Sequence, residues 1–236
     1  MSDPFLSAAS LEGVASAFAA TRDGIDALLR DRGLRRVSPE DTSRALLLGA
    51  AATAVLEGSE VTANELSDGA GDATARAALR LSTELLGLVP VWRRAPVQAI
   101  ARLHALAAAG SVPDDALGRP DGDTSRLVAL ARNVSAPTKA PGLVVAAIVH
   151  AEILSSGAFS SHAGVVARAA ERIVLVELGV DPPSVTVPEA GHAAVPDGYR
   201  SALEAYATGT ETGLAQWLKY ASQAFARGAE ASPLAG

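Results

Sequence analysis

Runs of alanine mixed with leucine and valine recur along this chain, as in "LLLGAAATAVL" and "HALAAAG". Alanine has the highest helix propensity, and its small side chain lets neighbouring helices approach closely. Of all residues 49% are hydrophobic but only 4% aromatic, and no segment shows the alternation of a half-buried strand. We therefore predict an all-α fold, a helical bundle built around closely packed helices.

Helix boundaries are marked by capping residues. Ser38, Pro39 and Asp41 give an N-cap, a proline in the first turn and an acid at the third helical position, and Gly58 ends that helix. Thr62 starts a second capping box. Further helices are predicted near residues 10–32, 72–88, 96–109, 124–134, 139–156, 164–178, 196–207 and 210–228.

The length of 236 residues predicts a single domain, 1–236. We divide it into an N-terminal helical part (1–70), a core (71–180), C-terminal helices (181–228) and a tail (229–236) expected to be frayed. Residues 110–125 and 178–198 are predicted to be irregular, with the chain crossing the surface near 181–188.

Charge and composition exclude several classes of function. The formal charge of -6 and the pI near 5.2 argue against a nucleic-acid partner, which needs a concentrated basic face. Without cysteine there are no disulfides or thiolate metal sites, which fits a reducing cytoplasm. The N-terminus carries no secretion signal, and the longest apolar run, 140–154, is too short for a bilayer. We predict a cytoplasmic protein with no membrane and no nucleic-acid partner.

A loop of serine and glycine, "SSGAFSSHAG", interrupts two very hydrophobic segments. Gly164 stands at the start of an apolar helix, whose first N–H groups lack intrahelical acceptors. Arg168, one turn further on, would add a cation at the same end. The segment could therefore form an anion pocket, but ordinary turns between helices share these features, so from the local pattern alone we favour a plain turn.

Residues 150–168, "HAEILSSGAFSSHAGVVAR", resemble the signature of the Fic/DOC (Fido) family, HPFxDGNGRxxR. Phe159, Gly164 and Arg168 match the motif phenylalanine, final glycine and last arginine. The other positions depart from it. Gly157 stands for the histidine, Ala158 for the proline, Ser161 for the acid, His162 for the first glycine, Ala163 for the asparagine and Val165 for the first arginine.

Upstream, "TAVLEGSEVTANEL" is similar to the inhibitory helix of Fic proteins, with Thr53, Glu57 and Gly58 matching its motif. "IARLHALAAAGSVPDDALGRP" resembles the segment between the two motifs, so the resemblance covers roughly residues 40–180. It implies a Fido-like bundle with a central core helix after the motif loop. In the family the inhibitory glutamate pairs with the last motif arginine, and we predict a buried ion pair between Glu57 and Arg168.

The resemblance also implies a chemistry that this sequence retains only in part. In Fic enzymes the motif histidine is the general base, a contribution of about 10²–10⁴ in rate, and Gly157 cannot supply it. The resemblance implies a nucleotide or anion site formed by Phe159, His162, Ala163, Gly164 and Arg168. The segment 133–142, "NVSAPTKAPG", leaves little length for the family's β-hairpin flap, which holds target peptides.

The remaining histidines allow two interpretations. His162 is a substitute catalytic residue or, as we favour, a loop histidine without an orienting acid. His150 and His104 are expected to bond within core helices, and since no two histidines share a helical metal-ligand spacing we predict no metal site. Asp121 and Asp123 superficially match a calcium loop but lack its downstream glutamate, so we predict a plain turn.

Two functions follow from the resemblance. We favour a catalytically impaired pseudo-nucleotidyltransferase that acts as a binding or regulatory protein, with its pocket closed by Glu57. The alternative is a diverged transferase that moves AMP or a related phosphate-containing group to a protein hydroxyl. ATP or another nucleotide with Mg²⁺ is the expected ligand where the pocket is open, and a protein is the expected partner or target. The oligomeric state stays open.

Overall fold

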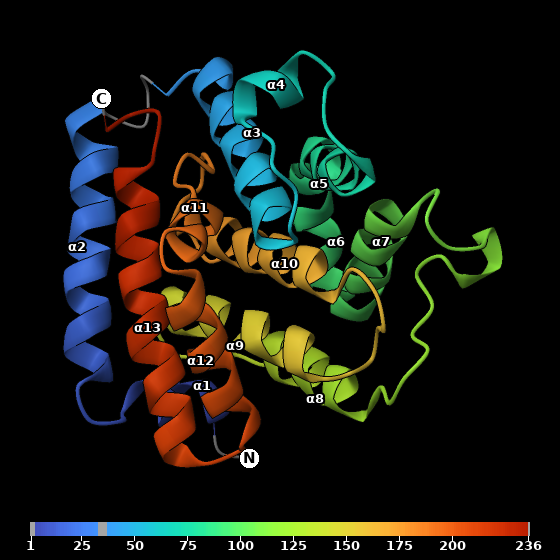
Figure 1. The fold of residues 1–236 in the computed structure, drawn as a ribbon. Coiled ribbons are helices and arrows are strands. Elements are labelled where there is room, and N and C mark those ends of the chain that lie inside the picture. Colours follow the sequence, from blue (N-terminus) through green and yellow to red (C-terminus); the bar gives the residue numbers. More distant parts are fainter. Residues whose placement is uncertain (1–2, 33–36, 236) are drawn as a thin grey trace.

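The computed structural model describes residues 3–32 and 37–235, and over these ranges the chain forms helices and no strands (Figure 1). The all-α prediction is confirmed. The helices are α1 (Pro4–Ala9), α2 (Val14–Arg32), α3 (Pro39–Leu56), α4 (Ala63–Ser67), α5 (Ala73–Glu84), α6 (Val89–Arg94), α7 (Pro96–Ala108), α8 (Ser125–Ser135), α9 (Gly142–Ser155), α10 (Ala163–Glu177), α11 (Pro188–Ala193), α12 (Pro196–Ala207) and α13 (Glu211–Glu230), with short 3-10 helices at Leu85–Leu88 and Asp114–Ala116.

The predicted caps set the ends of α3 and the start of α4. The Ser38 hydroxyl accepts the N–H of Asp41 at 3.1 Å, and the Asp41 carboxylate accepts the N–H of Ser38 at 3.0 Å. Thr62 and Glu65 form the same reciprocal pair at α4. Gly58, at a φ of +90°, turns the chain away immediately after α3. These caps place Glu57 at the end of a rigid helix.

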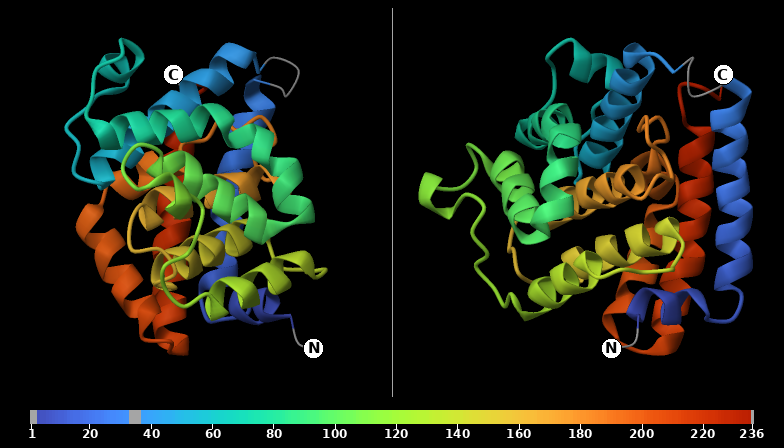
Figure 2. Two further views of the ribbon diagram at one scale, coloured as in Figure 1. Left: turned by 90° about the vertical axis from the view of Figure 1, so that its right-hand side faces the viewer. Right: turned by 180° about the vertical axis from the view of Figure 1, so that it is seen from behind.

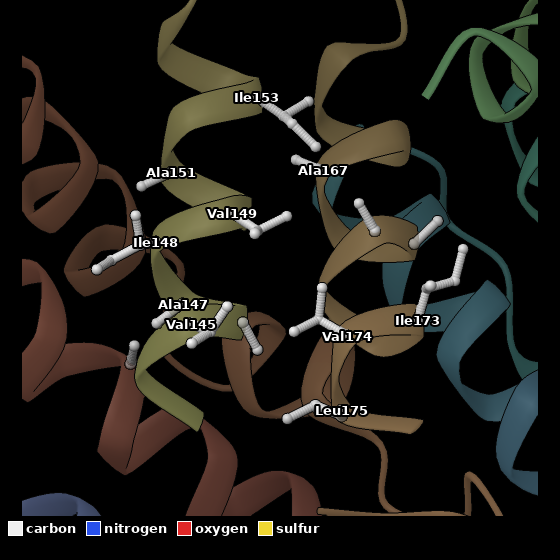
Figure 3. Packing of buried hydrophobic residues seen from close by; sticks show 14 of the residues in the cluster. Val145, Ala147, Ile148, Val149, Ala151, Ile153, Ala167, Ile173, Val174 and Leu175 are labelled. Atoms are coloured by element: carbon white, nitrogen blue, oxygen red, sulfur yellow. The ribbon is translucent and has the colours of Figure 1, made fainter. Parts of the chain in front are cut away.

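Helices α9 and α10 form the centre of the bundle and lie side by side (Figure 1). Val149 and Ile153 of α9 point toward α10, and Val174 points back from α10 (Figure 3). Each of these side chains is no more than 1% exposed. Close packing of branched aliphatic side chains against alanines holds the two helices rigidly together.

The other helices enclose this pair. α3 and α5 pack together on the side of α10 that faces away from α9, and α13 packs against α9, α11 and α12. α2 runs along the outer side of α13 (Figures 1 and 2). The connection between α7 and α8, residues 109–124, projects away from the bundle and returns to it (Figure 2). None of the described helices is both long and apolar enough to cross a lipid bilayer.

Two predictions about the C-terminal part are wrong. Residues 181–188 do not run over the surface, because Asp181, Ser184 and Thr186 are each no more than 2% exposed. Their polar groups bond to one another, as where the Asp181 carboxylate accepts the N–H of Thr186 at 2.7 Å. The tail is not frayed either, since Leu234 is 8% exposed and belongs to the main hydrophobic core.

Candidate functional site

Helix α10 carries charged side chains into the middle of the protein. Arg168, Glu171 and Arg172 are spaced three and four residues apart, so they share one face of the helix. All are nearly or completely buried, with at most 2% exposure. Buried charges are tolerated only when paired, and each finds its partner on a different element: Glu57 for Arg168, Glu189 for Arg172, and two histidines for Glu171.

The predicted ion pair between Glu57 and Arg168 is present. One terminal guanidinium nitrogen of Arg168 donates to Glu57 Oε1, and the other donates to the Tyr199 hydroxyl at 3.3 Å. The side chain of Arg168 is 2% exposed and that of Glu57 30%, so the pair is buried from the arginine side only. Burial opposes the charge on Arg168, but Tyr199 and Glu57 outweigh it and raise the pKa of Arg168 above its ordinary value.

The Glu57 carboxylate also lies over the start of α10. Gly164 sits in the first turn, and a Cβ atom there would collide with Glu57 Oε1. The N-cap residue, His162, has a φ of 59° and makes no side-chain bond to the helix end. Helix N-termini attract anions through their free N–H groups and dipole. A negative group therefore already occupies the place where an anion would bind.

The motif loop itself is held by packing. Phe159 is 6% exposed and its ring stacks on His104 at a centroid distance of 4.3 Å. Ala163 begins α10 and packs partly buried against the core. Gly157 has a φ of +66°, a conformation that costs a residue with a side chain roughly 1–2 kcal/mol. The position that aligns with the family's histidine thus has a backbone suited to glycine.

The connection between α7 and α8 contacts the motif loop. Residues 136–141 join α8 to the start of α9, whereas the motif loop follows the other end of α9. The N–H groups of Asp121 and Gly122 donate to the carbonyl of Ala158 at 3.0 and 3.1 Å. The Asp121 carboxylate accepts the N–H of Ser160 at 2.9 Å, so the predicted turn ties residues 110–124 to the loop.

His162 lies at the end of the motif loop and contacts the connection between α7 and α8, residues 109–124. Its Nε2 is 3.2 Å from the Ser111 hydroxyl, which donates its own proton to the carbonyl of Ala108 at 2.8 Å. Nε2 must therefore carry the hydrogen of that contact, which leaves Nδ1 as a lone pair. Nδ1 is buried and makes no hydrogen bond with any residue that the structure describes.

The pKa of His162 can be measured directly. Burial lowers the pKa of His162 below its ordinary value of 6.5, while Glu57 opposes this shift and Arg80 adds to it. In an NMR titration the midpoint of His162 is expected below 6.5, and it should fall further in Glu57→Ala because the opposing charge is gone.

The lowered pKa of His162 determines in which direction the free energy of unfolding changes with pH. The pKa of His162 is lower in the folded than in the unfolded protein. The contribution of His162 to the free energy of unfolding is therefore fully present above about pH 6.5 and is lost as the pH falls through the pKa of the folded state. The variant His162→Asn should flatten that part of the stability curve. A midpoint at or above 6.5 in the wild-type protein would contradict the burial of this ring.

The structure brings most predicted site residues together. Glu57, Gly164 and Arg168 are in contact, and His162 borders them. Thr53, one turn before Glu57, is buried at 6% exposure. It lines a small gap beside Val165, Ala169 and Arg172 on α10.

Two residues of the site were missed. Tyr199, on α12, bonds to Arg168, and Arg80, on α5, lies near His162 while its own N–H groups bond to the last carbonyls of α7. Both come from distant helices, and no local pattern marks them.

The residues fit a phosphate better than a metal-bound nucleotide. Arg168 Nε is buried without a hydrogen-bond partner among the described residues, so the guanidinium has a donor to spare. Gly164 leaves the helix end open to a close approach. The position of the motif acid, however, is Ser161, and the nearby Asp121 carboxylate is engaged with Ser160. The described residues of the loop therefore lack a free carboxylate for Mg²⁺, whereas the donors that a phosphate would need are present.

Fold and site together define an all-α protein in which a carboxylate from the end of α3 bonds to Arg168 and lies over the start of the central helix α10. A solved structure of a Fic family protein from Desulfovibrio desulfuricans G20 is similar to it, with a TM-score of 0.73. The match has 15% sequence identity and covers 92% of this chain and 74% of that one, which establishes a Fic-like fold. No protein-family model matches the sequence, and no curated protein matches it.

Proposed function

We propose that this chain is a non-catalytic Fic-type protein whose phosphate cradle is held closed by Glu57 and which acts as a binding or regulatory protein. One observation carries the proposal: the Glu57 carboxylate lies against Gly164 and bonds to Arg168. A carboxylate in that position meets the same N–H dipoles and guanidinium that a phosphate would meet. Ligand and glutamate therefore compete for one place.

The absence of the usual catalytic groups argues against transfer chemistry. Gly157 replaces the general base, and its positive φ disfavours a histidine there. Val165 replaces a phosphate-binding arginine and is buried in the core at 3% exposure. Placing a histidine at position 157 and an arginine at position 165 would thus require changes in the backbone and in the core packing as well as in the side chains.

Calorimetric titration with ATP, in the presence and in the absence of magnesium, tests whether Glu57 closes the site. We expect no measurable heat from the wild-type protein and clear binding by Glu57→Ala. Removal of a competing contact worth about 3 kcal/mol strengthens binding by roughly 100-fold. Glu60→Ala is the matched control, because Glu60 is an exposed acid in the loop that follows α3.

Either of two results would contradict this proposal. The first is a folded Glu57→Ala protein that gives no heat. The second is a wild-type protein that binds ATP as tightly as the variant, since Glu57 would then not close the site.

The alternative, a diverged nucleotidyltransferase, has one observation in its favour. His162 Nδ1 is buried without a partner among the described residues, and the ring lies near enough to Glu57 for its pKa to respond to that charge, so His162 is a candidate base. Labelling of a protein hydroxyl from isotopically labelled ATP, abolished by both His162→Ala and Arg168→Met, would support transfer. Under the main proposal neither the wild-type protein nor Glu57→Ala transfers label from ATP to a protein, although Glu57→Ala binds ATP.

A further inference from the structure

A second cluster of titratable side chains lies in the core, away from the Glu57 carboxylate. His150 on α9, Glu171 on α10 and His192 on α11 are each 0% exposed. His150 Nδ1 is 3.0 Å from Glu171 Oε1, and His192 Nε2 is 3.1 Å from Glu171 Oε2. One ligand atom from each residue lies within 4.8 Å of the other two. Two imidazoles thus face the two oxygens of one carboxylate.

The outer nitrogen of each ring is held by a tyrosine. His150 Nε2 is 2.7 Å from the Tyr199 hydroxyl, and His192 Nδ1 is 3.1 Å from the Tyr220 hydroxyl. Metal-binding histidines characteristically donate their second N–H to such an outer partner, which fixes the tautomer and the ring orientation. In the metal-free arrangement His192 Nε2 is within hydrogen-bond distance of both Glu171 oxygens, at 3.4 and 3.1 Å. In the tautomers with hydrogen on the outer nitrogens, both inner nitrogens would instead present lone pairs toward a shared cation.

Hydrogen bonding satisfies only part of this cluster, because His192 Nε2 bonds to Glu171 whereas His150 Nδ1 has no hydrogen-bond partner among the described residues. His150 Nδ1 is buried, and in spite of its short distance to Glu171 it makes no hydrogen bond of acceptable geometry with any described residue. The neighbouring arginines of α10 are engaged elsewhere, Arg168 with Glu57 and Arg172 with Glu189. The Glu171 carboxylate therefore faces two imidazole rings and forms no ion pair with an arginine among the described residues. A cation between these groups would use the free lone pair and balance the charge.

We propose that His150, Glu171 and His192 form a structural zinc site, with both oxygens of Glu171 completing a set of four donors. Nitrogen and oxygen donors bind Zn²⁺ at about 2.0–2.2 Å. Donor atoms 3.0 and 3.1 Å apart can reach a shared ion at that length with small side-chain shifts. Imidazole donors favour zinc over Mg²⁺ or Ca²⁺, which take oxygen.

The ion would join three helices that the chain brings together only on folding. Aromatic rings enclose the cluster, with the Trp217 ring 5.3 Å from His150 and 6.2 Å from His192 between centroids. Metal binding at so enclosed a place is coupled to folding. No two histidines lie at helical metal-ligand spacing in the sequence, which predicts no metal site, whereas these three ligands come from separate helices.

Refolding with and without zinc tests the site. The protein is unfolded with a chelator, refolded in metal-free buffer with or without zinc sulfate, and freed of loose metal by gel filtration. We expect a single tightly held zinc ion per chain by elemental mass spectrometry. With free zinc about 1,000-fold above Kd, the melting temperature should rise on the order of 10 °C. Substoichiometric zinc together with an unchanged melting temperature would overturn the proposal.

Substitutions assign the ligands. Glu171→Gln and His192→Gln should lose the zinc, while the control His104→Gln, which alters a buried histidine outside the cluster, should retain it. Retention of zinc by both cluster variants, or its loss in the control alone, would overturn the assignment. If the cluster variants do not fold, cobalt replaces zinc in the wild-type protein. Visible absorption bands of a four-coordinate cobalt site would support the proposal, and those of six-coordinate aqueous cobalt would refute it.

Discussion

Replacing Glu57 with alanine is expected to lower the free energy of unfolding by about 3 kcal/mol, because it leaves the Arg168 guanidinium buried without a counter-charge. Arg168 would keep only its 3.3 Å contact with the Tyr199 hydroxyl, and its Nε is already unpartnered. We place the loss at the lower end of the range for buried pairs because the Glu57 side chain is 30% exposed. For a chain of this length the melting temperature should fall by roughly 6–12 °C.

Urea denaturation followed by circular dichroism measures this loss. Glu60→Ala should change stability by no more than about 0.5 kcal/mol. The double variant Glu57→Ala/Arg168→Met should cost clearly less than the two single changes added together, since the stranded charge is gone. Additive losses would mean that the two side chains are not coupled. Added phosphate should restore part of the stability of Glu57→Ala and none of the double variant's.

Replacing Glu189 with alanine should cost about 3–5 kcal/mol, because it strands Arg172 in the interior. Arg172 Nε donates to Glu189 Oε1 at 2.8 Å, and a terminal nitrogen donates to the carbonyl of Thr186 at 2.8 Å. The side chains of Arg172 and Glu189 are 2% and 5% exposed, so water cannot replace the lost partner. Gly49 on α3 makes room for the pair, since a Cβ there would lie 2.8 Å from the guanidinium.

The matched control for this pair is an exposed one. Arg93 and Glu177 are 3.2 Å apart, with Arg93 66% exposed, so Glu177→Ala should cost no more than about 1 kcal/mol in the same denaturation experiment. A Glu189→Ala protein as stable as this control would contradict the role assigned to the buried pair. Glu189→Ala should also leave ATP binding at the wild-type level. If it opened the cradle as Glu57→Ala does, the gate would not be specific to Glu57.

Local signals predicted much of the fold but missed several short helices. α1, α6 and α11 are six residues each, too short for a hydrophobic period to stand out. α11 begins with Pro188 and Glu189, which are typical of a helix start, but Gly191 has a low helix propensity and argues against a helix there. That glycine is required by tertiary contact, because a Cβ there would collide with the backbone of Ala224 on α13.

The residues of the candidate site also fall into two groups, those that the sequence indicated and those that only the structure revealed. The sequence pointed to Gly164, Arg168 and Glu57, since motif order and helix ends are local properties of the chain. It could not reveal the residue that bonds to Arg168 from α12, the segment that contacts the loop, or the histidine from α11 that faces Glu171. These partners depend on how distant helices are placed, and no spacing along the chain encodes that placement.

By itself the sequence determined an all-α chain and most of its longer helices with their caps, whereas the pairing of Glu57 with Arg168 was expected only from the resemblance to the Fic family. Helix propensity, capping and apolar periodicity act over a few residues, so they can be recognised in a single sequence. Only the tertiary structure decided that α10 buries three charged side chains and which groups neutralise them. The cost of a buried charge depends on its solvent exposure and on partners from other helices, and both arise only when the bundle closes.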